Sequence, residues 1–226
     1  MGPHPLWLCE ELCQHLDLKP GMRVLDMGCG KGLTSVFLAK EYGVTVFAND
    51  LWIPATENLG RFEAAGVADR VFPIHADAHA LPYAEGFFDA AIAIDSYHYF
   101  GACENYLIDV FAKLVKPGGQ LGVVIPGLKQ EFEKGCPDTL KSLWIPELFN
   151  FHSNAWWRRL WEKTGLCNIT SCYDIAETKA IWQDWADWSV ENFNAEWGDG
   201  GDFDAKFLAA DTNDDLALII MSAQKI

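Results

Sequence analysis

Short apolar runs alternate with helix-forming or turn-forming segments through the first 127 residues, and this alternation constrains the fold more than any other feature of the chain. The predicted strands cover residues 23–27, 44–50, 70–77, 87–95 and 120–126. The predicted helices cover residues 6–17, 33–42, 54–65 and 105–115. Strands that alternate with helices form a parallel sheet covered on both faces, and such strands are almost continuously apolar, as these are. The pattern predicts a doubly wound α/β fold.

The second half of the chain is less regular. It predicts a helix over residues 153–164, a strand over 167–175, a tryptophan-rich helix over 176–193 and a closing strand over 215–226. We expect a single domain over residues 1–226, with an N-terminal helix, a core and two insertions on the substrate side. These parts are expected at residues 1–19, 20–127, 128–152 and 176–214. The second insertion would form a helical lid over the core.

The formal net charge of −15 is distributed unevenly. Residues 174–215 carry twelve acidic side chains against Lys179 and Lys206, which gives −10 and leaves −5 for the rest of the chain. Binding to nucleic acid or to an anionic membrane surface requires clustered cations, so the charge argues against both. No run is apolar enough to span a bilayer, and no leader sequence follows Met1. We therefore expect a soluble cytoplasmic protein.

The seven cysteines are odd in number, and none are arranged as C-x-x-C. This pattern predicts reduced thiols, without a disulfide framework or a zinc site. His75 and His79 have the spacing of metal ligands on a helix, but they follow a strand-like run, so the spacing does not place them on one face. No metal site is predicted.

The stretch VLDMGCGKG lies between the first predicted strand and its helix. A glycine-rich turn at this place lets a ligand approach the backbone closely. Dinucleotide-binding turns follow G-x-G-x-x-G/A, and Gly28 and Gly30 fit this pattern, but Leu33 stands at the third position. Asp26, two residues before Gly28, would repel a pyrophosphate and attract the ammonium group of an amino acid. The turn therefore favours S-adenosylmethionine over a nicotinamide dinucleotide.

Aspartates also end the later strands. Asp50 ends the second strand, where an acid can accept hydrogen bonds from ribose hydroxyls. Asp77 ends the third strand, where its carboxylate can accept from an adenine amino group while the Ala78 N–H donates to a ring nitrogen. Each aspartate alone is equally well explained as a turn former. Together with Asp26 and Asp95 they would line one crevice at the carboxyl ends of the strands.

Residues 20–127 resemble a class I S-adenosylmethionine-dependent methyltransferase domain, of the branch found in bacterial small-molecule enzymes. The resemblance rests on VLDMGCGKG, VFAND, HADAHALPYAEGFFDAAIAIDS and LVKPGGQLGVV, in that order. It implies a seven-stranded sheet whose last strand is antiparallel, which DLALIIMSAQKI would supply. It also implies S-adenosylmethionine as cofactor, bound by Asp26, Gly28, Cys29, Gly30, Asp50, Leu51, Asp77, Ala78 and Asp95.

The stretch AIAIDSYHYFG places proton-handling side chains just past the fourth strand, where this family holds groups near the transferring methyl. His98 is the catalytic candidate, because an imidazole with an ordinary pKa suits a base at neutral pH. It can equally serve to position the acceptor. Tyr97 and Tyr99 are candidates for the substrate side, although in an extended segment they would point away from His98.

Tryptophans recur every three residues at Trp182, Trp185 and Trp188, with Phe193 and Trp197 beyond them. Such a stripe typically packs against a core or a homodimer partner. Trp182 and Trp185 are also candidates for the wall of a pocket that would suit a cationic amine. The predicted function is methyl transfer to nitrogen or oxygen of a small molecule. A lipid- or quinone-modifying enzyme and a non-catalytic S-adenosylmethionine-binding protein are the alternatives.

Overall fold

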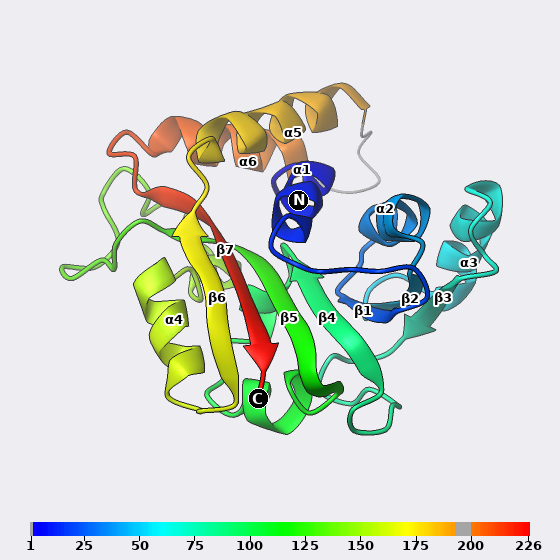
Figure 1. Ribbon diagram of the computed structural model, residues 1–226. Coiled ribbons are helices and arrows are strands. Elements are labelled where there is room, and N and C mark those ends of the chain that lie inside the picture. The colour runs from blue at the N-terminus through cyan, green and yellow to red at the C-terminus, as the bar shows by residue number, and fades with distance from the viewer. Residues whose placement is uncertain (1, 193–199) are drawn as a thin grey trace.

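The computed structural model describes residues 2–192 and 200–226 and contains a seven-stranded sheet in the order β3-β2-β1-β4-β5-β7-β6 (Figure 1). The first five strands in this order are parallel, and β7 is antiparallel to both of its neighbours. The doubly wound sheet with an antiparallel last strand is thereby confirmed. The strands are β1 Arg23–Met27, β2 Thr45–Asp50, β3 Val71–His75, β4 Phe88–Ile94, β5 Val115–Leu128, β6 Cys167–Asp174 and β7 Leu216–Lys225.

Helices cover both faces of the sheet, because alternate strand residues point to opposite sides. On one face Val24 belongs to a buried cluster with α1, α2 and α3, and on the other Leu25 belongs to a cluster with α4 and the π-helix η2. The helical elements are α1 Pro5–Cys13, α2 Leu33–Tyr42, α3 Ala55–Ala64, η1 Tyr97–Tyr99, η2 Leu107–Phe111, η3 Pro146–Leu148, α4 Asn154–Glu162, α5 Thr178–Asn192 and α6 Gly200–Ala210.

Three elements differ from the sequence-based expectation. The helix predicted over 105–115 is a π-helix, in which the Ala112 N–H bonds the Leu107 carbonyl, five residues back, at 2.9 Å. Residues 116–119, which lie between the helix predicted over 105–115 and the strand predicted over 120–126, form a bulge within β5, because Val115 pairs with Phe88 while Gln120 pairs with Ala90. Helix α6 was not predicted, since its acidic and glycine-rich start hides a short apolar face.

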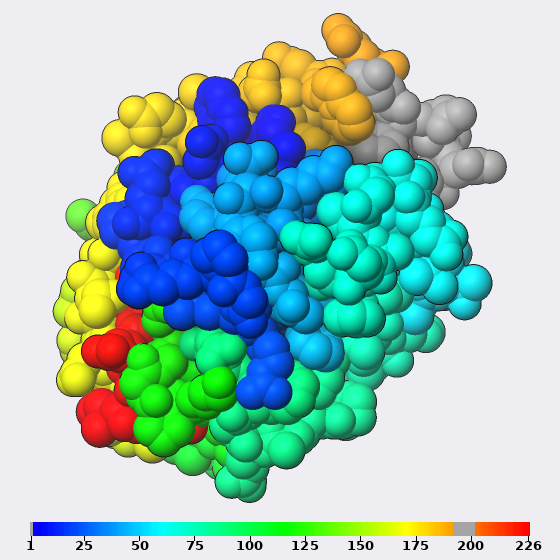
Figure 2. Space-filling model, turned by 45° about the vertical axis from the view of Figure 1, so that its right-hand side comes forward, coloured from blue at the N-terminus to red at the C-terminus, as the bar shows by residue number. Residues whose placement is uncertain are grey.

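Helices α5 and α6 pack side by side above the carboxyl ends of the parallel strands and form a lid (Figure 1). The N-terminal residues, deep blue in Figure 2, lie between this lid and α2. Of the helices within residues 2–192 and 200–226, none is long and apolar enough to cross a membrane.

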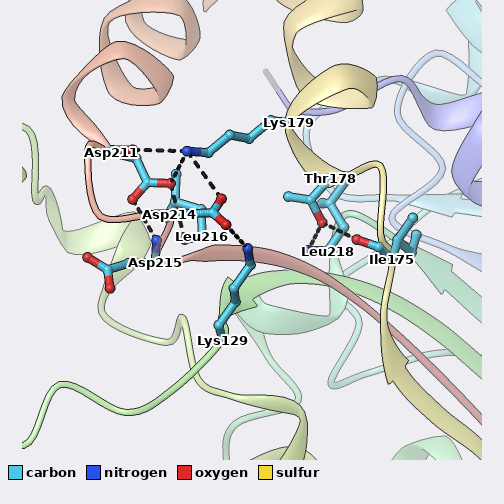
Figure 3. Close-up of polar contacts among 9 residues, drawn as sticks. All are labelled: Lys129, Ile175, Thr178, Lys179, Asp211, Asp214, Asp215, Leu216 and Leu218. Carbon is cyan, nitrogen blue, oxygen red and sulfur yellow. Dashed lines mark hydrogen bonds and ion pairs between the residues drawn. The ribbon is translucent and has the colours of Figure 1, made fainter.

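Ionic and hydrogen bonds tie the lid to the sheet (Figure 3). Lys179 of α5 donates to the Asp211 carbonyl at 3.0 Å and pairs with the Asp214 carboxylate, which also pairs with Lys129 at the end of β5. The buried Asp211 carboxylate accepts the Asp215 N–H at 2.7 Å, where β7 is about to begin. Because these bonds hold the ends of both lid helices, the lid has a defined position over the strand ends.

Candidate active site

The glycine turn after β1 is shaped by two neighbours in the sheet. Gly28 has a φ of +72°, and a Cβ at this position would lie 2.4 Å from the Ser96 Cβ. The N–H groups of Gly28 and Cys29 both donate to the Asn49 carbonyl at 2.9 Å. Gly30 has a φ of +54°, and a Cβ there would meet no atom within 4 Å. Gly28 therefore allows close packing with the end of β4, whereas Gly30 leaves an open side for a ligand.

Asp26 supports the turn from inside. Its Oδ2 accepts the Thr34 and Ser35 hydroxyls at 2.7 and 2.6 Å, which holds the start of α2 against β1. Burial raises the pKa of Asp26. Only Oδ1 remains to accept from a ligand ammonium group, since this buried atom has no partner within residues 2–192 and 200–226. The methionine contact implied by the resemblance therefore depends on this one atom, and the observed contacts make Asp26 a positioning residue.

Asp50 links the glycine turn to the loop after β2. Its Oδ2 accepts the Gly30 N–H at 2.8 Å, and its Oδ1 accepts the N–H groups of Trp52 and Ile53 at 2.8 and 2.9 Å. A carboxylate has about four acceptor sites, and the three bonds leave roughly one for a ribose hydroxyl. Leu51 and Trp52 are 52% and 68% exposed and present apolar surface beside it.

Asp77 and Ala78 present a donor and an acceptor side by side. The Asp77 Oδ1 accepts the backbone N–H and the ring nitrogen of His79 at 2.8 and 2.9 Å, and these bonds lower the pKa of Asp77. Within the described part of the chain, neither Asp77 Oδ2 nor the Ala78 N–H takes part in a hydrogen bond. The pair matches what the edge of an adenine ring requires.

We expect Asp77→Ala to weaken binding of S-adenosylhomocysteine about tenfold or more, because one bond to a charged acceptor is lost. Folding should be unaffected, since the side chain is 53% exposed. Isothermal titration calorimetry measures the affinity. Asp69→Ala, which removes another exposed acid, is the control. Equal affinities of the two variants would remove Asp77 from the cofactor site.

His98 lies in the 3₁₀ turn η1 and is 4% exposed. The centroid of its ring lies 4.2 Å from that of Tyr99 and 5.6 Å from that of Phe151. The Asn150 side chain donates to the His98 carbonyl at 3.0 Å. Burial lowers the pKa of His98 to about 3, so the imidazole is neutral at physiological pH. Its Nδ1 is buried and has no hydrogen-bond partner among the residues that the structure describes. The side chain is thus an available polar group and a weak base.

The expectation that Tyr97 and Tyr99 share one direction is wrong. A 3₁₀ turn does not alternate as a strand does, and it sends Tyr97 into the core on the α4 face, where its ring lies 5.1 Å from Phe111 and 5.8 Å from Trp161. Tyr97 is fully buried there, so we correct its assignment to the substrate side. Tyr99 instead reaches Trp52 across β1, with centroids 5.4 Å apart.

Asp95 stands at the mouth of β4 with a φ of +52°. Burial raises its pKa to about 8, and the Asp204 carboxylate adds to the rise. Residues 2–4, which we name the N-terminal strap, lie against it: a Cβ on Gly2 would be 1.7 Å from Asp95 Oδ2. The Gly2 N–H donates to Asp204 Oδ2 at 3.3 Å, so the strap runs between the end of β4 and helix α6.

Two tryptophans of α5 contact Asp204 and the strap. Trp182 is 3% exposed, lies 6.4 Å from Phe151 and 6.0 Å from Phe207 between ring centroids, and donates to Asp204 Oδ1 at 3.4 Å. The Trp185 ring lies 5.5 Å from the His4 ring of the strap. Phe193 and Trp197, which continue the predicted stripe, lie outside the described residues. Trp182 thus packs between α6 and Phe151, and Trp185 packs on the strap.

Four residues of this site were not singled out from the sequence. Asn49 accepts the glycine-turn amides, Asn58 donates to the Gly30 carbonyl at 2.9 Å, and the Ser96 hydroxyl donates to the Met27 carbonyl at 2.6 Å. Asp204 comes from the unpredicted helix α6. Asn49 precedes Asp50 and Ser96 follows Asp95, so their places beside two strand ends could have identified them as site residues. No feature of the sequence singles out Asn58 or Asp204.

Residues 24–119 match the family model described as "Methyltransferase domain". The methyltransferase GfsG of Streptomyces halstedii is 34% identical over 117 residues, which are 51% of this chain and 42% of that protein. The 27-O-demethylrifamycin SV methyltransferase of Amycolatopsis mediterranei (strain S699) is 33% identical over 117 residues, 51% of this chain and 43% of that protein. The chain thus spans less than half the length of either relative.

Solved structures show the same fold. Phosphoethanolamine N-methyltransferase 2 of Haemonchus contortus, in complex with S-adenosyl-L-methionine, superposes with a TM-score of 0.81 at 19% identity. The match covers 99% of this chain and 53% of that one. At this identity the likeness concerns the fold alone.

Proposed function

We propose that the chain belongs to the class I S-adenosylmethionine-dependent methyltransferase family, as its match to a methyltransferase domain indicates, and that it methylates a nitrogen or an oxygen atom of a small molecule. The observation that carries the proposal is the set of unfilled contacts at the strand ends: the open side of Gly30 and the unbonded Ala78 N–H beside the Asp77 carboxylate. These features fit S-adenosylmethionine better than a pyrophosphate-containing cofactor, because carboxylates surround the site.

The bound cofactor supplies a methyl group on a sulfonium, which is already a good leaving group. The protein then has to align the acceptor with that methyl and keep water out. In this chain the glycine turn and Asp77 would orient the cofactor from the strand ends. The lid, the strap and the ring of Tyr99 would exclude water. Asp26, Asp50 and Asn58 would act one step further back, by holding the turn.

His98 fits a positioning role in this proposal better than that of a base. A neutral imidazole offers one acceptor lone pair and one N–H, and either can hold an acceptor group in line. With its pKa near 3, the ring in this environment is too weak to take a proton from an amine or an alcohol at neutral pH. The acceptor would therefore be oriented by His98 and deprotonated by another group or by solvent.

We expect His98→Gln to lower turnover at least tenfold at saturating cofactor, because glutamine cannot reproduce the geometry of a buried imidazole. The variant's rate should follow pH between 6 and 8 as the wild type's does, since His98 does not titrate there. Initial rates of S-adenosylhomocysteine release measure both. His15→Gln is the control, because His15 lies just after α1 and bonds Tyr173 and Ser171 of β6. Wild-type turnover would exclude His98 from the reaction, and a lost inflection near pH 6.5 would make it a base.

Two measurements test the function as a whole. Calorimetry with S-adenosylhomocysteine asks whether the cofactor site binds, and no binding would overturn the proposal. Incubation of the protein with S-adenosylmethionine and fractionated small-molecule extracts then asks whether S-adenosylhomocysteine is released. Release with a particular fraction identifies the acceptor, whereas binding without release from any fraction favours a non-catalytic cofactor-binding protein.

A further inference from the structure

We propose that Tyr106 and His79 are positioning residues for the adenine ring of the cofactor. They would hold the Asp77 carboxylate and the Ala78 N–H in the orientation that contacts the edge of the ring. The inference rests on the proposed function, because it adds to the same cofactor site two residues that would not themselves touch adenine. It is carried by a chain of hydrogen bonds that runs from the core to the exposed Asp77 side chain.

The segment that holds Asp77 and Ala78 lies at the margin of the sheet. It follows β3, which is the edge strand and pairs with β2. On the side of β2, the Asn49 side chain donates to the Ala76 carbonyl at 2.9 Å, one residue before Asp77. The Asp77 side chain is 53% exposed, so its carboxylate would rotate freely unless further contacts fixed it.

Tyr106 supplies one of these contacts from the core. It lies just before η2 and is buried, and its hydroxyl donates to the Ala78 carbonyl at 3.1 Å. The hydroxyl also lies 2.8 Å from Met27 Sδ, but a thioether is a weak acceptor, so the carbonyl receives the stronger bond. Burial raises the pKa of Tyr106 and the nearby Asp77 carboxylate adds to the rise, so the phenol keeps the proton that it donates.

One planar peptide unit transmits this constraint to Asp77. The Ala78 carbonyl and the His79 N–H belong to the same unit, which is rigid. Tyr106 holds its carbonyl end, and its N–H end donates to Asp77 Oδ1 at 2.8 Å. The His79 ring binds the same oxygen through Nδ1 at 2.9 Å and meets the Tyr106 ring edge-on, with centroids 5.2 Å apart. Asp77 Oδ1 thus carries two bonds, which leaves Oδ2 for a ligand.

A fixed carboxylate matters because the edge of adenine presents a donor beside an acceptor. The 6-amino group would donate to Asp77 Oδ2 while N1 accepts from the Ala78 N–H. Hypoxanthine has a carbonyl at C6 and an N–H at position 1, so it presents the opposite pattern and leaves both protein groups unpaired. A carboxylate that could turn away would reject hypoxanthine less strongly, because hydrogen bonds and their repulsive counterparts depend steeply on geometry.

The test uses S-adenosylhomocysteine and S-inosylhomocysteine, which differ only at this edge of the base. Calorimetry on the full chain measures both affinities, and their ratio is the readout. We expect the wild type to prefer S-adenosylhomocysteine about a hundredfold or more. Tyr106→Phe and His79→Ala should each lower this ratio about fivefold or more, because each loses a bond that holds the carboxylate. A merely structural role would weaken both ligands by the same factor and leave the ratio unchanged.

Tyr97→Phe is the control. It removes the hydroxyl of another buried tyrosine, whose ring lies 5.9 Å from that of Tyr106, and it should leave the ratio unchanged. His79 is 56% exposed, so His79→Ala leaves the core intact and tests the inference even if Tyr106→Phe does not fold. An unchanged ratio in either folded variant, or equal binding of the two ligands by the wild type, would overturn the inference. Failure of the wild type to bind either ligand would instead reject the proposed function.

Discussion

Replacing Gly28 with alanine is expected to abolish binding of S-adenosylhomocysteine and to lower the free energy of unfolding by about 3 kcal/mol. Two costs add. The backbone at Gly28 has a φ of +72°, which an L-residue with a Cβ adopts only under strain. The new methyl group would also lie 2.4 Å from the Ser96 Cβ, inside any permitted contact. Ser96 cannot easily yield, because its hydroxyl is bonded to the Met27 carbonyl at 2.6 Å.

Gly66→Ala separates the two costs. Gly66 also has a positive φ of +70°, but a Cβ there would meet no atom within 4 Å, and it lies after α3, away from the glycine turn. It should therefore show only the backbone strain and bind normally. Urea unfolding and calorimetry on both variants make the comparison. If Gly28→Ala were no less stable than Gly66→Ala and bound as well, the close approach of the turn to β4 would not matter for the site.

The second large effect is expected from Asp95→Asn in the dependence of stability on pH. The folded carboxyl has a pKa of about 8, above its value of about 3.9 in the unfolded chain. The folded state therefore keeps a proton that the unfolded state releases. The associated stability is fully present below about pH 4 and is lost as the pH rises to about 8, by at most about 1.4 kcal/mol per pH unit. Asparagine stays neutral, so the Asp95→Asn variant should not show this loss of stability.

Urea unfolding of the wild type and Asp95→Asn between pH 4 and 9 measures the difference. It should grow with pH and level off above about pH 8 at no more than about 6 kcal/mol. His98 contributes in the opposite direction, at acid pH, but equally in both proteins, so its contribution cancels. Parallel pH profiles would show that Asp95 titrates normally and is not buried by the strap.

The central sheet, and the residues that we propose for the cofactor, could be predicted from the sequence alone. Their signals are local: an apolar run marks each strand, and the glycine turn follows one of them directly. In a parallel sheet the carboxyl ends share one edge, so residues such as Asp50 and Asp77 can be brought together by reasoning from strand ends alone. Even here the hydrogen bonds needed the structure, since Asp26 holds helix α2 and Asp50 holds three backbone amides.

The tertiary structure decided the acceptor side. The 3₁₀ turn after β4 separated Tyr97 from Tyr99, because its side chains do not alternate as those of a strand do. Asp204 accepts a hydrogen bond from Gly2, 202 positions away in the sequence. It also accepts one from Trp182, although its helix α6 shows no clear pattern in the sequence. Contacts of this kind depend on how separate elements pack. They leave no periodic trace in the residues themselves, so the contacts among these acids, rings and the strap follow only from the folded chain.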